Sequence, residues 1–361
     1  MKTKTLCFFA FVVVTFAAFA SSVSFSQVKS LFDTGKTPYK IMEESKEHYY
    51  MENVGAIVDS IPVSDFVNVY FPQKLQHAHY PKIISIGDSL IKYSLFKFDP
   101  SALKLVNEGE KYYLKFNYEK ARRLFKKAIA ISDSCYIAYI YIGDTYALSG
   151  KPSKALKYYN KAYSINPNDY KIPLSQGRAY KMMKKYNEAL EKFIDALVLL
   201  PRNEDVLSEL SSLAKVMNFK LVDNSFHPQA LVLKKDDGVH IYVGDNPNWL
   251  FYAVVKAVWL GENYYGDSLT AKDSGLPTWS TQEEWEALVY MIENYVSMRK
   301  ENDVEDDAYL DKLARIMDDD LLTGFILYEI GSRLFPDIVL QTPMAARKEV
   351  RGYINKYVVV R

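Results

Sequence analysis

The middle of the chain repeats itself every 34 residues, and this period constrains the fold more than any other feature of the sequence. Five sets of like residues keep the spacing: Gly109, Gly143 and Gly177; Tyr112, Tyr146 and Tyr180; Ala121, Ala155 and Ala189; Ala128, Ala162 and Ala196; and the aromatic Phe125, Tyr159 and Phe193. A period of this length indicates stacked helix pairs, because one short pair cannot bury its own apolar face. The sequence therefore predicts three stacked pairs over residues 102–203.

Each predicted pair consists of two helices joined by a turn. The turns are expected at residues 116–118, 149–152 and 184–187. The glycine of the first helix and the first alanine of the second are small, so the two backbones can approach closely where the helices cross. The pairs end at Asp133, Pro167 and Pro201, and proline ends a helix because it has no N–H to donate.

This pattern resembles that of the tetratricopeptide repeat (TPR) family over residues 102–203. The first pair departs from it, since Glu108 and Asp133 replace an apolar residue and a proline. The resemblance implies an α-solenoid that binds protein partners, without indicating which partner. Residues 204–217 are expected to form a helix that caps the stack. Its apolar residues at helical spacing are Leu207, Leu210, Leu213 and Val216.

In a TPR stack the first helix of each pair lines a concave face. Helical phase places these residues on it: Val106, Glu110, Tyr113, Ile140, Asp144, Ala147, Leu174, Arg178 and Lys181. Seven of them are candidate partner-binding residues: Glu110, Tyr113, Ile140, Asp144, Leu174, Arg178 and Lys181. The face changes from acidic and aromatic to basic, so we expect a partner segment with both charge signs or an apolar stripe. The alternative is that a flanking segment covers this face.

TPR domains that bind chaperones grip a C-terminal carboxylate with a clamp of lysine and asparagine. The matching positions here are Val106, Glu110, Tyr141, Lys171 and Ser175, of which only the lysine is retained. We therefore expect no carboxylate clamp.

The N-terminus has the pattern of a secretory signal peptide. Lys2 and Lys4 precede an uncharged apolar stretch over residues 6–20, and small residues allow cleavage after Ala20 or after Ser26. The alternative is an uncleaved anchor, but a stretch of 15 residues is shorter than the roughly 20 that span a bilayer. We expect cleavage, export to the periplasm or the medium, and no stable membrane span in the mature chain.

Charge and cysteine content argue against a nucleic-acid-binding protein and against a fold held by disulfides. The chain has 45 basic and 44 acidic residues, and removal of residues 1–26 takes away two lysines, leaving 43 against 44, a net charge of −1. No strong positive field remains to hold nucleic acid. Cys135 is then the sole cysteine, so no internal disulfide can form.

Two sequence blocks suggest a hydrolase. The tetrapeptide Gly-Asp-Ser-Leu occurs twice, with Ser89 and Ser268 as its serines, and Asp237 and His240 form a D-x-x-H block between the copies. These blocks resemble the two ends of the catalytic set of SGNH (GDSL-type) esterases. The esterase is disfavoured, because the helix pairs between Ser89 and His240 leave no chain for one α/β sheet. No histidine follows Ser268 to serve as its base.

A helix cap and a hairpin turn account for the same sequence blocks. We expect Asp88 or Ser89 to cap a helix that runs through Tyr93. Residues 236–238 are expected to form the turn of a hairpin between strands 230–235 and 239–244.

Two other patterns are weak metal signals. His77-x-His79 has no third ligand near it in sequence, and the acidic run 303–311 lacks the glycine of a calcium loop. The acidic run is better explained as a helix start. We expect no metal and no cofactor.

The chain is thus expected to be mainly α, in four segments: a signal peptide over 1–26, a mixed region over 27–100, the TPR domain with its cap helix over 101–217, and an α-rich domain over 218–361 entered by the hairpin. The first flank should be helical over 39–50 and extended over 67–71 and 82–86. The second should hold a buried helix over 249–260, a helix capped by Ser280 and Glu283 that buries one face, and three more. That face is Trp285, Leu288, Ile292 and Tyr295, and the later helices are near 308–317, 321–334 and 345–357.

These observations lead to an exported, non-enzymatic scaffold that binds a protein or peptide. The alternative is an envelope enzyme whose site lies within 218–361, with the repeats recruiting its substrate. A pocket there with a cluster of perturbed titratable groups would favour the enzyme.

Overall fold

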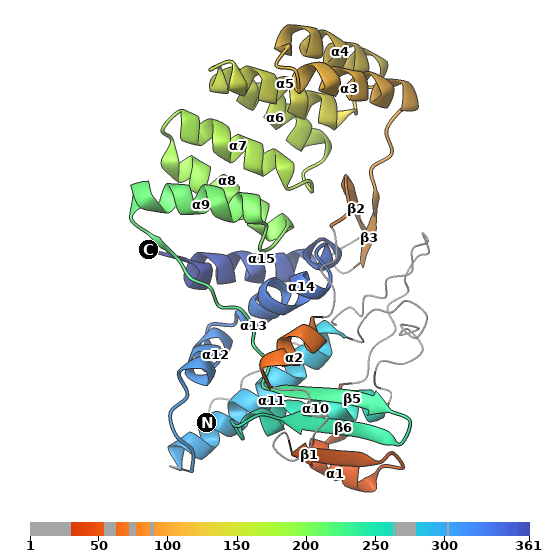
Figure 1. The fold of residues 1–361 in the computed structure, drawn as a ribbon, viewed down its shortest axis with the longest axis vertical. Helices are drawn as coiled ribbons and strands as arrows, with labels where there is room; N and C mark the ends of the chain where they lie inside the picture. The colour runs from red at the N-terminus through yellow and green to blue at the C-terminus, as the bar shows by residue number, and fades with distance from the viewer. Residues whose placement is uncertain are drawn as a thin grey trace. The chain divides into compact units, whose positions relative to one another are not determined.

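The computed structural model describes residues 30–53, 63–71, 77–86, 90–262, 264, 279–301 and 303–361. The expected signal peptide and both Gly-Asp-Ser triplets lie outside these residues. The chain forms two compact units (Figure 1). The sheet unit comprises Met1–Leu75 and Ser225–Leu334, and the repeat unit comprises Gln76–Asn224 and Phe335–Arg361. These units are interleaved along the chain, unlike the four consecutive segments expected.

The repeat unit contains the three predicted helix pairs and the helix after them. The helices are α3 (Pro100–Tyr113), α4 (Tyr118–Ile131), α5 (Tyr136–Leu148), α6 (Pro152–Ile165), α7 (Lys171–Met182), α8 (Tyr186–Leu199) and α9 (Glu204–Met217). Phe116, Gly150 and Lys184 turn the chain within the three pairs, all with φ between 58° and 71°. The mainly helical fold is confirmed, and so is the register of the repeat.

Each repeat glycine lies directly under an aromatic ring of the second helix. A Cβ atom on Gly109 would lie 2.5 Å from Phe125, one on Gly143 would lie 2.4 Å from Tyr159, and one on Gly177 would lie 2.5 Å from Phe193. Real Cβ atoms do not approach that closely, so only glycine allows the two helices to cross here. The close crossing predicted from the small residues is confirmed.

The period continues into α9. Ser211 occupies the glycine position, and Asn218, with φ of 55°, occupies the position of Phe116, Gly150 and Lys184. Helix α9 therefore occupies the position of a first helix in the repeat, after the third pair. The chain then forms strand β4 (Lys220–Leu221) instead of a second helix, and Ser211 is exposed.

The C-terminal residues return to the repeat unit. Helix α15 (Met344–Tyr353) continues into a π-helical turn, η6 (Ile354–Val358), and strand β7 (Val359–Val360) pairs antiparallel with β4. Helix α15 packs on α8, where Arg351 forms ion pairs of 2.5 Å with Glu191 and Asp195. The expected C-terminal helix exists, but it stacks on the repeat.

A β-hairpin precedes the first pair. Strands β2 (Pro81–Ile86) and β3 (Leu90–Leu95) are antiparallel, with Ile86 opposite Leu90. The extended segment at 82–86 is confirmed, whereas the expected helix through Tyr93 is wrong. Tyr93 lies in β3 opposite Ile83, and its hydroxyl donates to Asp337, so a tertiary contact favours the strand.

The sheet unit is built on three strands in the order β1–β6–β5. The predicted hairpin of β5 (Ala230–Lys235) and β6 (Gly238–Val243) is confirmed, and β1 (Tyr49–Asn53) pairs parallel with β6. Because β6 is central, His240 and Tyr242 are buried as well as Val239 and Ile241. Helix α10 (Trp249–Gly261) packs on β5 and β6 and is the predicted buried helix.

Two expectations for the first flank are wrong. Residues 39–50 do not form one helix, because α1 (Pro38–Glu44) ends before β1 begins. Residues 67–71, expected to be extended, belong largely to α2 (Val63–Tyr70). Valine favours strands, but packing of Phe66 of this helix against Leu231 and Tyr242 decides the local structure.

The rest of the sheet unit is helical: α11 (Thr281–Lys300), α12 (Ala308–Asp318), α13 (Leu322–Phe325), the π-helical turn η4 (Ile326–Gly331) and α14 (Ser332–Leu334). The capping box of Ser280 and Glu283 is confirmed, and Leu288, Ile292 and Tyr295 are fully buried. Trp285 is only half-buried. No helix within the described ranges combines the length and apolarity needed to cross a bilayer.

Candidate functional site

The candidate partner-binding residues lie on α3, α5 and α7, and α9 extends their array; we call this surface the first-helix face. Val106, Ile140 and Leu174 form its floor. Ile140 and Leu174 are 9% and 4% exposed, which leaves little of either side chain for contact with a partner. The exposed and half-buried members are Glu110, Tyr113, Asp144, Arg178 and Lys181.

One half of the face is acidic and aromatic. The Tyr141 hydroxyl donates to Glu110 Oε1 at 2.5 Å, and the Tyr159 hydroxyl donates to Asp144 Oδ1 at 2.7 Å. Burial raises the pKa of Asp144 to about 6. The Tyr113 and Tyr141 rings meet edge to face with centroids 5.5 Å apart. Tyrosine faces beside carboxylates attract a cation.

The other half carries an internal ion-pair network. Glu209 of α9 accepts from Arg178 Nε at 2.7 Å and also pairs with Lys181. Burial alone would raise the pKa of Glu209, but the hydrogen bonds from Lys181 and Arg178 lower it below its ordinary value. Sequence reasoning missed Glu209. Continuing the 34-residue period into α9 would have found it, one period after Ser175.

A flanking segment covers part of the repeat. Tyr80, Phe96 and Phe98 pack around Tyr136, the first residue of α5, and Asn166 Nδ2 donates to the Pro81 carbonyl at 2.9 Å. The contacts lie at the start of α5 and in the loop before α7. Arg178, farther along α7, remains exposed.

Of the five positions that match the carboxylate clamp, only Lys171 keeps the clamp residue. This retained lysine lies 5.9 Å over the Tyr80 ring, beside the covering segment.

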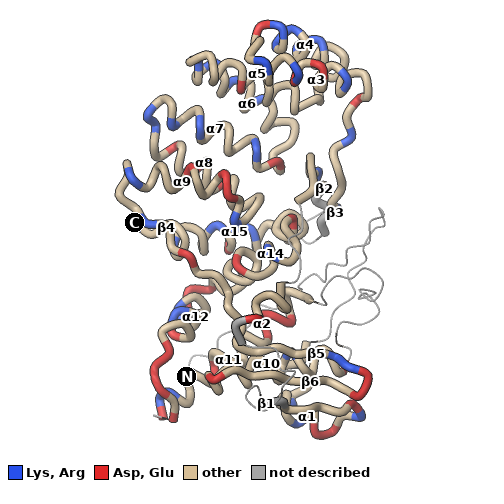
Figure 2. The backbone as a smooth tube through the Cα atoms, viewed as in Figure 1, with Lys and Arg blue, Asp and Glu red and all other residues tan. Residues whose placement is uncertain are grey.

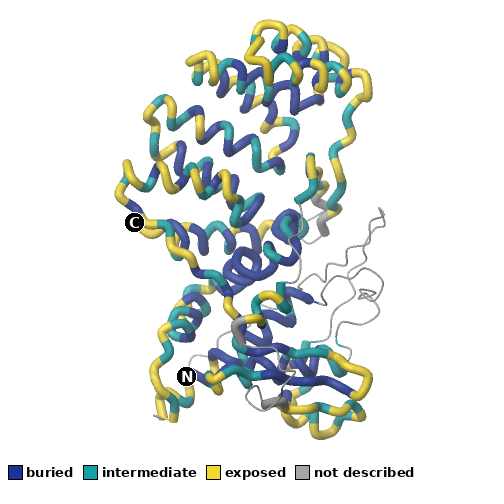
Figure 3. The backbone as a smooth tube through the Cα atoms, in the orientation of Figure 1, coloured by how far each residue is buried: buried dark blue, intermediate teal, exposed yellow. Residues whose placement is uncertain are grey.

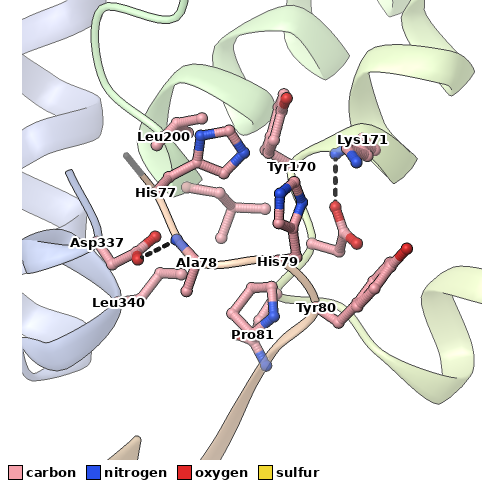
Figure 4. Close-up of a pocket in the computed structure, with 13 residues that line it drawn as sticks. His77, Ala78, His79, Tyr80, Pro81, Tyr170, Lys171, Leu200, Asp337 and Leu340 are labelled. Carbon is pink, nitrogen blue, oxygen red and sulfur yellow. Dashed lines mark hydrogen bonds between the residues drawn. The ribbon is translucent and has the colours of Figure 1, made fainter. Parts of the chain in front are cut away.

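His77 and His79 lie in the loop before β2, at a small open pocket (Figure 4). Their rings are 5.6 Å apart. The nearby Asp337 accepts from the Ala78 N–H at 2.7 Å and from the Tyr93 hydroxyl at 3.2 Å. Burial lowers the pKa of His77, which favours its neutral form. Among the residues that the structure describes, no three His, Cys, Asp or Glu side chains are grouped to hold a metal ion.

The D-x-x-H block forms a local pair. His240 Nε2 lies 2.8 Å from Asp237 Oδ1, and the His240 ring stacks on Tyr50 at 4.8 Å. Ser89 and Ser268, the candidate nucleophiles, lie outside the described residues. The structure therefore describes only the Asp–His part of the motif, held within a hairpin.

The sheet unit contains a buried polar cluster, which we define as Tyr70, Tyr252, Lys256, Glu283 and Glu284. Lys256 Nζ lies 2.7 Å from Glu283 and 3.1 Å from Glu284. Glu284 also accepts from the hydroxyls of Tyr70 and Tyr252, the latter at 2.6 Å. Burial opposes the charge on Lys256, but Glu283 and Glu284 outweigh it and raise the lysine pKa above its ordinary value. The cluster thus pairs a charged lysine with two buried glutamates, one of which accepts the tyrosine hydroxyls.

A third buried carboxylate, Glu286, lies on the same helix as Glu283 and Glu284. Glu286 accepts from the Ser30 hydroxyl at 2.6 Å and from Trp259 Nε1 at 2.8 Å. It also accepts from the Leu31 N–H, which ties the start of the described chain to α11. Burial raises the pKa of Glu286. Sequence reasoning predicted Glu283 only as part of the capping box and missed Glu284 and Glu286. A carboxylate near a helix start is commonly a solvated partner of the helix dipole, so nothing in the sequence marked these side chains as buried.

Comparison with known families identifies a repeat segment in the chain. The family model of the tetratricopeptide repeat matches residues 136–169. The comparison with curated proteins found no match.

Among solved structures, the first TPR of Spaghetti (RPAP3) bound to the HSP90 peptide SRMEEVD is 23% identical, with 34% of this chain and 97% of that chain covered and a TM-score of 0.32. The Arabidopsis OM64 TPR domain is 23% identical, with 32% and 97% covered and a TM-score of 0.32. The Sgt2 TPR domain from Aspergillus fumigatus is 22% identical, with 34% and 82% covered and a TM-score of 0.32.

Proposed function

Because this chain contains a tetratricopeptide-repeat segment, we propose that it is a scaffold that binds a protein or peptide segment on the first-helix face. The observation that carries the proposal is the separation of charge on that face. Glu110 and Tyr113 lie on α3 and Asp144 lies on α5, whereas Arg178 and Lys181 lie on α7. A segment that carries both charge signs complements this arrangement.

The acidic and basic halves of the first-helix face differ in how readily a partner can bind to them. Glu110 and Asp144 each accept one tyrosine hydroxyl, so their side chains are held in place before a partner arrives. Lys181 and Arg178 already share Glu209, so an acidic group of the partner must compete with that carboxylate. The acidic half is therefore the stronger determinant, and we expect a basic or aromatic anchor in the partner.

A peptide array tests the scaffold. We expect the chain to retain peptides that combine a basic anchor with an acidic residue. Arg178→Glu with Lys181→Glu should weaken binding by about 2 kcal/mol or more, because it removes the basic half and repels the acidic residue of the partner. This double variant also places two acids beside Glu209. The matched control adds Glu209→Lys, which restores both ion pairs with reversed sign.

Three outcomes are distinguishable. The first outcome is that both the double variant and the charge-swapped triple variant lose binding, while the triple variant melts at the temperature of the parent. This outcome supports binding on the first-helix face. Recovery of binding in the triple variant would assign the loss to misfolding. Unaltered binding in both variants would place the partner elsewhere and contradict the proposal.

The proposal includes export. It rests on Lys2, Lys4 and the uncharged stretch 6–20, followed by small residues up to Ser26. N-terminal sequencing of protein from fractionated cells should give a chain that begins after Ala20 or after Ser26, outside the cytoplasm. A full-length cytosolic chain would contradict export and leave the partner-binding proposal standing.

The proposal also includes the absence of enzymatic activity. The buried polar cluster contains groups with shifted pKa values, as an active site would, but its hydrogen-bond donors already point at Glu284 and Glu283. It is better explained as a polar core. A fluorophosphonate probe should leave Ser89 unlabelled, and stoichiometric labelling there would revive the esterase.

A further inference from the structure

The turn ends of the helix pairs carry an exposed apolar side chain at one fixed repeat position. Leu114, Leu148, Met182 and Val216 lie 34 residues apart and are 67%, 58%, 51% and 58% exposed. Phe116, in the first turn, is 78% exposed. Single exposed apolar residues are ordinary on protein surfaces. A set at one position of every pair forms a continuous row along one edge, which we call the turn edge.

The turn edge is also basic. Lys115, Lys151 and Lys184 each follow the apolar residue of their turn by one to three positions, and all three are exposed. None of the three has an ion pair within the part of the chain that the structure describes. Blue segments mark the ends of helix pairs in Figure 2, among tan and red ones, and much of the tube there is yellow, for exposed, in Figure 3.

The opposite edge of the same unit is covered. There the loops between pairs, which include Asp169 and Tyr170, contact the segment from His77 to Pro81 (Figure 4). Tyr80 packs against Tyr136 at that edge. The repeat thus has one edge that its own chain covers with aromatic residues, and one edge where apolar residues and lysines face solvent.

We propose that the turn edge docks onto an anionic lipid surface. Lysine is depleted from protein–protein interfaces, whereas surfaces that bind membranes combine lysines with apolar side chains that enter the headgroup boundary. Each turn supplies one apolar side chain and at least one unpaired lysine, which is the composition that a negatively charged bilayer attracts. The row, with four apolar positions, places several weak contacts on one edge. It is distinct from the first-helix face and goes beyond the proposed peptide binding.

The expected affinity follows from the charges. A lysine close to an anionic membrane contributes about 1 kcal/mol, which is roughly a fivefold change in partition coefficient. Three lysines then contribute on the order of one hundredfold. Salt screens charges at an exposed surface, so docking should weaken as the ionic strength rises.

Vesicle sedimentation tests the proposal. The chain beginning at Gln27 retains every described residue and lacks the apolar stretch 6–20, which could enter a bilayer by itself. We expect it to sediment with vesicles that contain about one third phosphatidylglycerol and to stay in solution with vesicles of phosphatidylcholine alone. The variant Lys115→Glu, Lys151→Glu, Lys184→Glu should lose at least about a hundredfold in partition coefficient.

A charge-matched control separates the edge from the net charge. Lys126→Glu, Lys157→Glu and Lys161→Glu make the same charge change on the second helices, at exposed positions away from the turns. We expect this control to lose far less than the turn-edge variant. A second variant, with Leu148→Ser and Met182→Ser, should also weaken sedimentation while circular dichroism stays unchanged.

The proposal is overturned if the parent chain binds both vesicle types equally or binds neither. It is also overturned if the control loses as much as the turn-edge variant. Selective crosslinking of the turn edge to an acidic protein, without vesicle binding, would identify that edge as a protein interface instead. In each case peptide binding on the first-helix face is measured separately and need not change.

Discussion

In the repeat unit a glycine lies against an aromatic ring in each of the three helix pairs, as Gly143 does against Tyr159, whereas the sheet unit buries carboxylates against their donors, as Glu284 against Tyr252. The first kind of contact recurs with the period of the sequence. The second occurs once, at the meeting of segments from distant parts of the chain. A periodic apolar core can be recognised in a sequence by self-comparison, but a buried polar cluster has residues that look like ordinary surface charges.

The two cores should also respond differently to substitution, and the largest effect is expected in the polar one. Lys256→Met leaves Glu283 and Glu284 buried without their cation, which should lower the free energy of unfolding of the sheet unit by about 3–5 kcal/mol. All four tryptophans lie at 249–285, so tryptophan fluorescence during chemical denaturation reports on the sheet unit alone.

Two variants sharpen this prediction. Adding Glu283→Gln and Glu284→Gln to Lys256→Met should recover part of the lost stability, because the two carboxylates that faced the lysine are made neutral. Lys40→Met, at an exposed position of α1, is the matched control and should change little. An equal loss in the control, or no loss with Lys256→Met, would show that the cluster does not stabilise the sheet unit.

The next effect concerns the glycine contacts. Gly143→Leu forces atoms into the space of the Tyr159 ring, and such overpacking typically costs about 1–3 kcal/mol. Because neighbouring pairs of a solenoid stabilise one another, the loss should spread to the flanking pairs. Thermal melts followed by far-ultraviolet circular dichroism measure it, with tryptophan fluorescence of the sheet unit unchanged.

The matched control for this glycine is Ser211→Leu, at the same repeat position in α9. Ser211 is exposed, and the chain forms β4 after α9 in place of a second helix. We expect its melting temperature to stay close to that of the parent. Equal melting temperatures for Gly143→Leu and the parent would refute the register of the repeat.

A smaller effect concerns pH and Asp144. Burial raises the pKa of this carboxyl from 3.8 to about 6, so the folded state holds the proton more tightly than the unfolded chain does. The stability that this group contributes is complete below pH 3.8 and is lost as the pH rises through about 6. The charged and titratable groups that act on it are Tyr113, Tyr141, Tyr159 and Arg178.

Asp144→Asn removes this dependence and can still accept from Tyr159. The stability of the variant relative to the parent should therefore increase between pH 4 and pH 7 and then level off. Denaturation at a series of pH values measures the difference, with Asp133→Asn in an exposed loop as the control. A difference that falls as the pH rises would contradict the assigned burial.

The smallest effect is expected where α15 joins the repeat unit. Arg351 pairs with Glu191 and Asp195 of α8 near the surface, and exposed ion pairs contribute about 0.2–1 kcal/mol each. Arg351→Ala should destabilise the repeat unit by no more than this range, and the effect should shrink at high salt. Val350→Ala, at a fully buried position of the same helix, should cost more. If both variants leave the melt of the repeat unit unchanged, α15 does not stabilise it.

The candidate site was predictable in part. The charges of Glu110, Asp144, Arg178 and Lys181, and their shared face, follow from helical phase within a 34-residue period. Their hydrogen-bond partners do not follow from the phase of one helix, because Tyr141 and Tyr159 come from neighbouring helices of the stack. Glu209 follows only when the period is continued into α9. The burial of Ile140 and Leu174 likewise depends on how neighbouring pairs pack.

The sequence by itself determined the helix pairs, the glycine crossings, the hairpin at 230–243 and the capping box of Ser280. In each case the signal and the contact lie within a few tens of residues, so a local pattern encodes them. Tertiary structure alone decided that β1 pairs with β6, that residues 67–70 are helical, that Tyr93 lies in a strand and that residues 335–361 join the repeat unit. These choices depend on free energy gained between segments far apart in the chain, such as Tyr50 opposite His240, which outweighs the local preference of either segment.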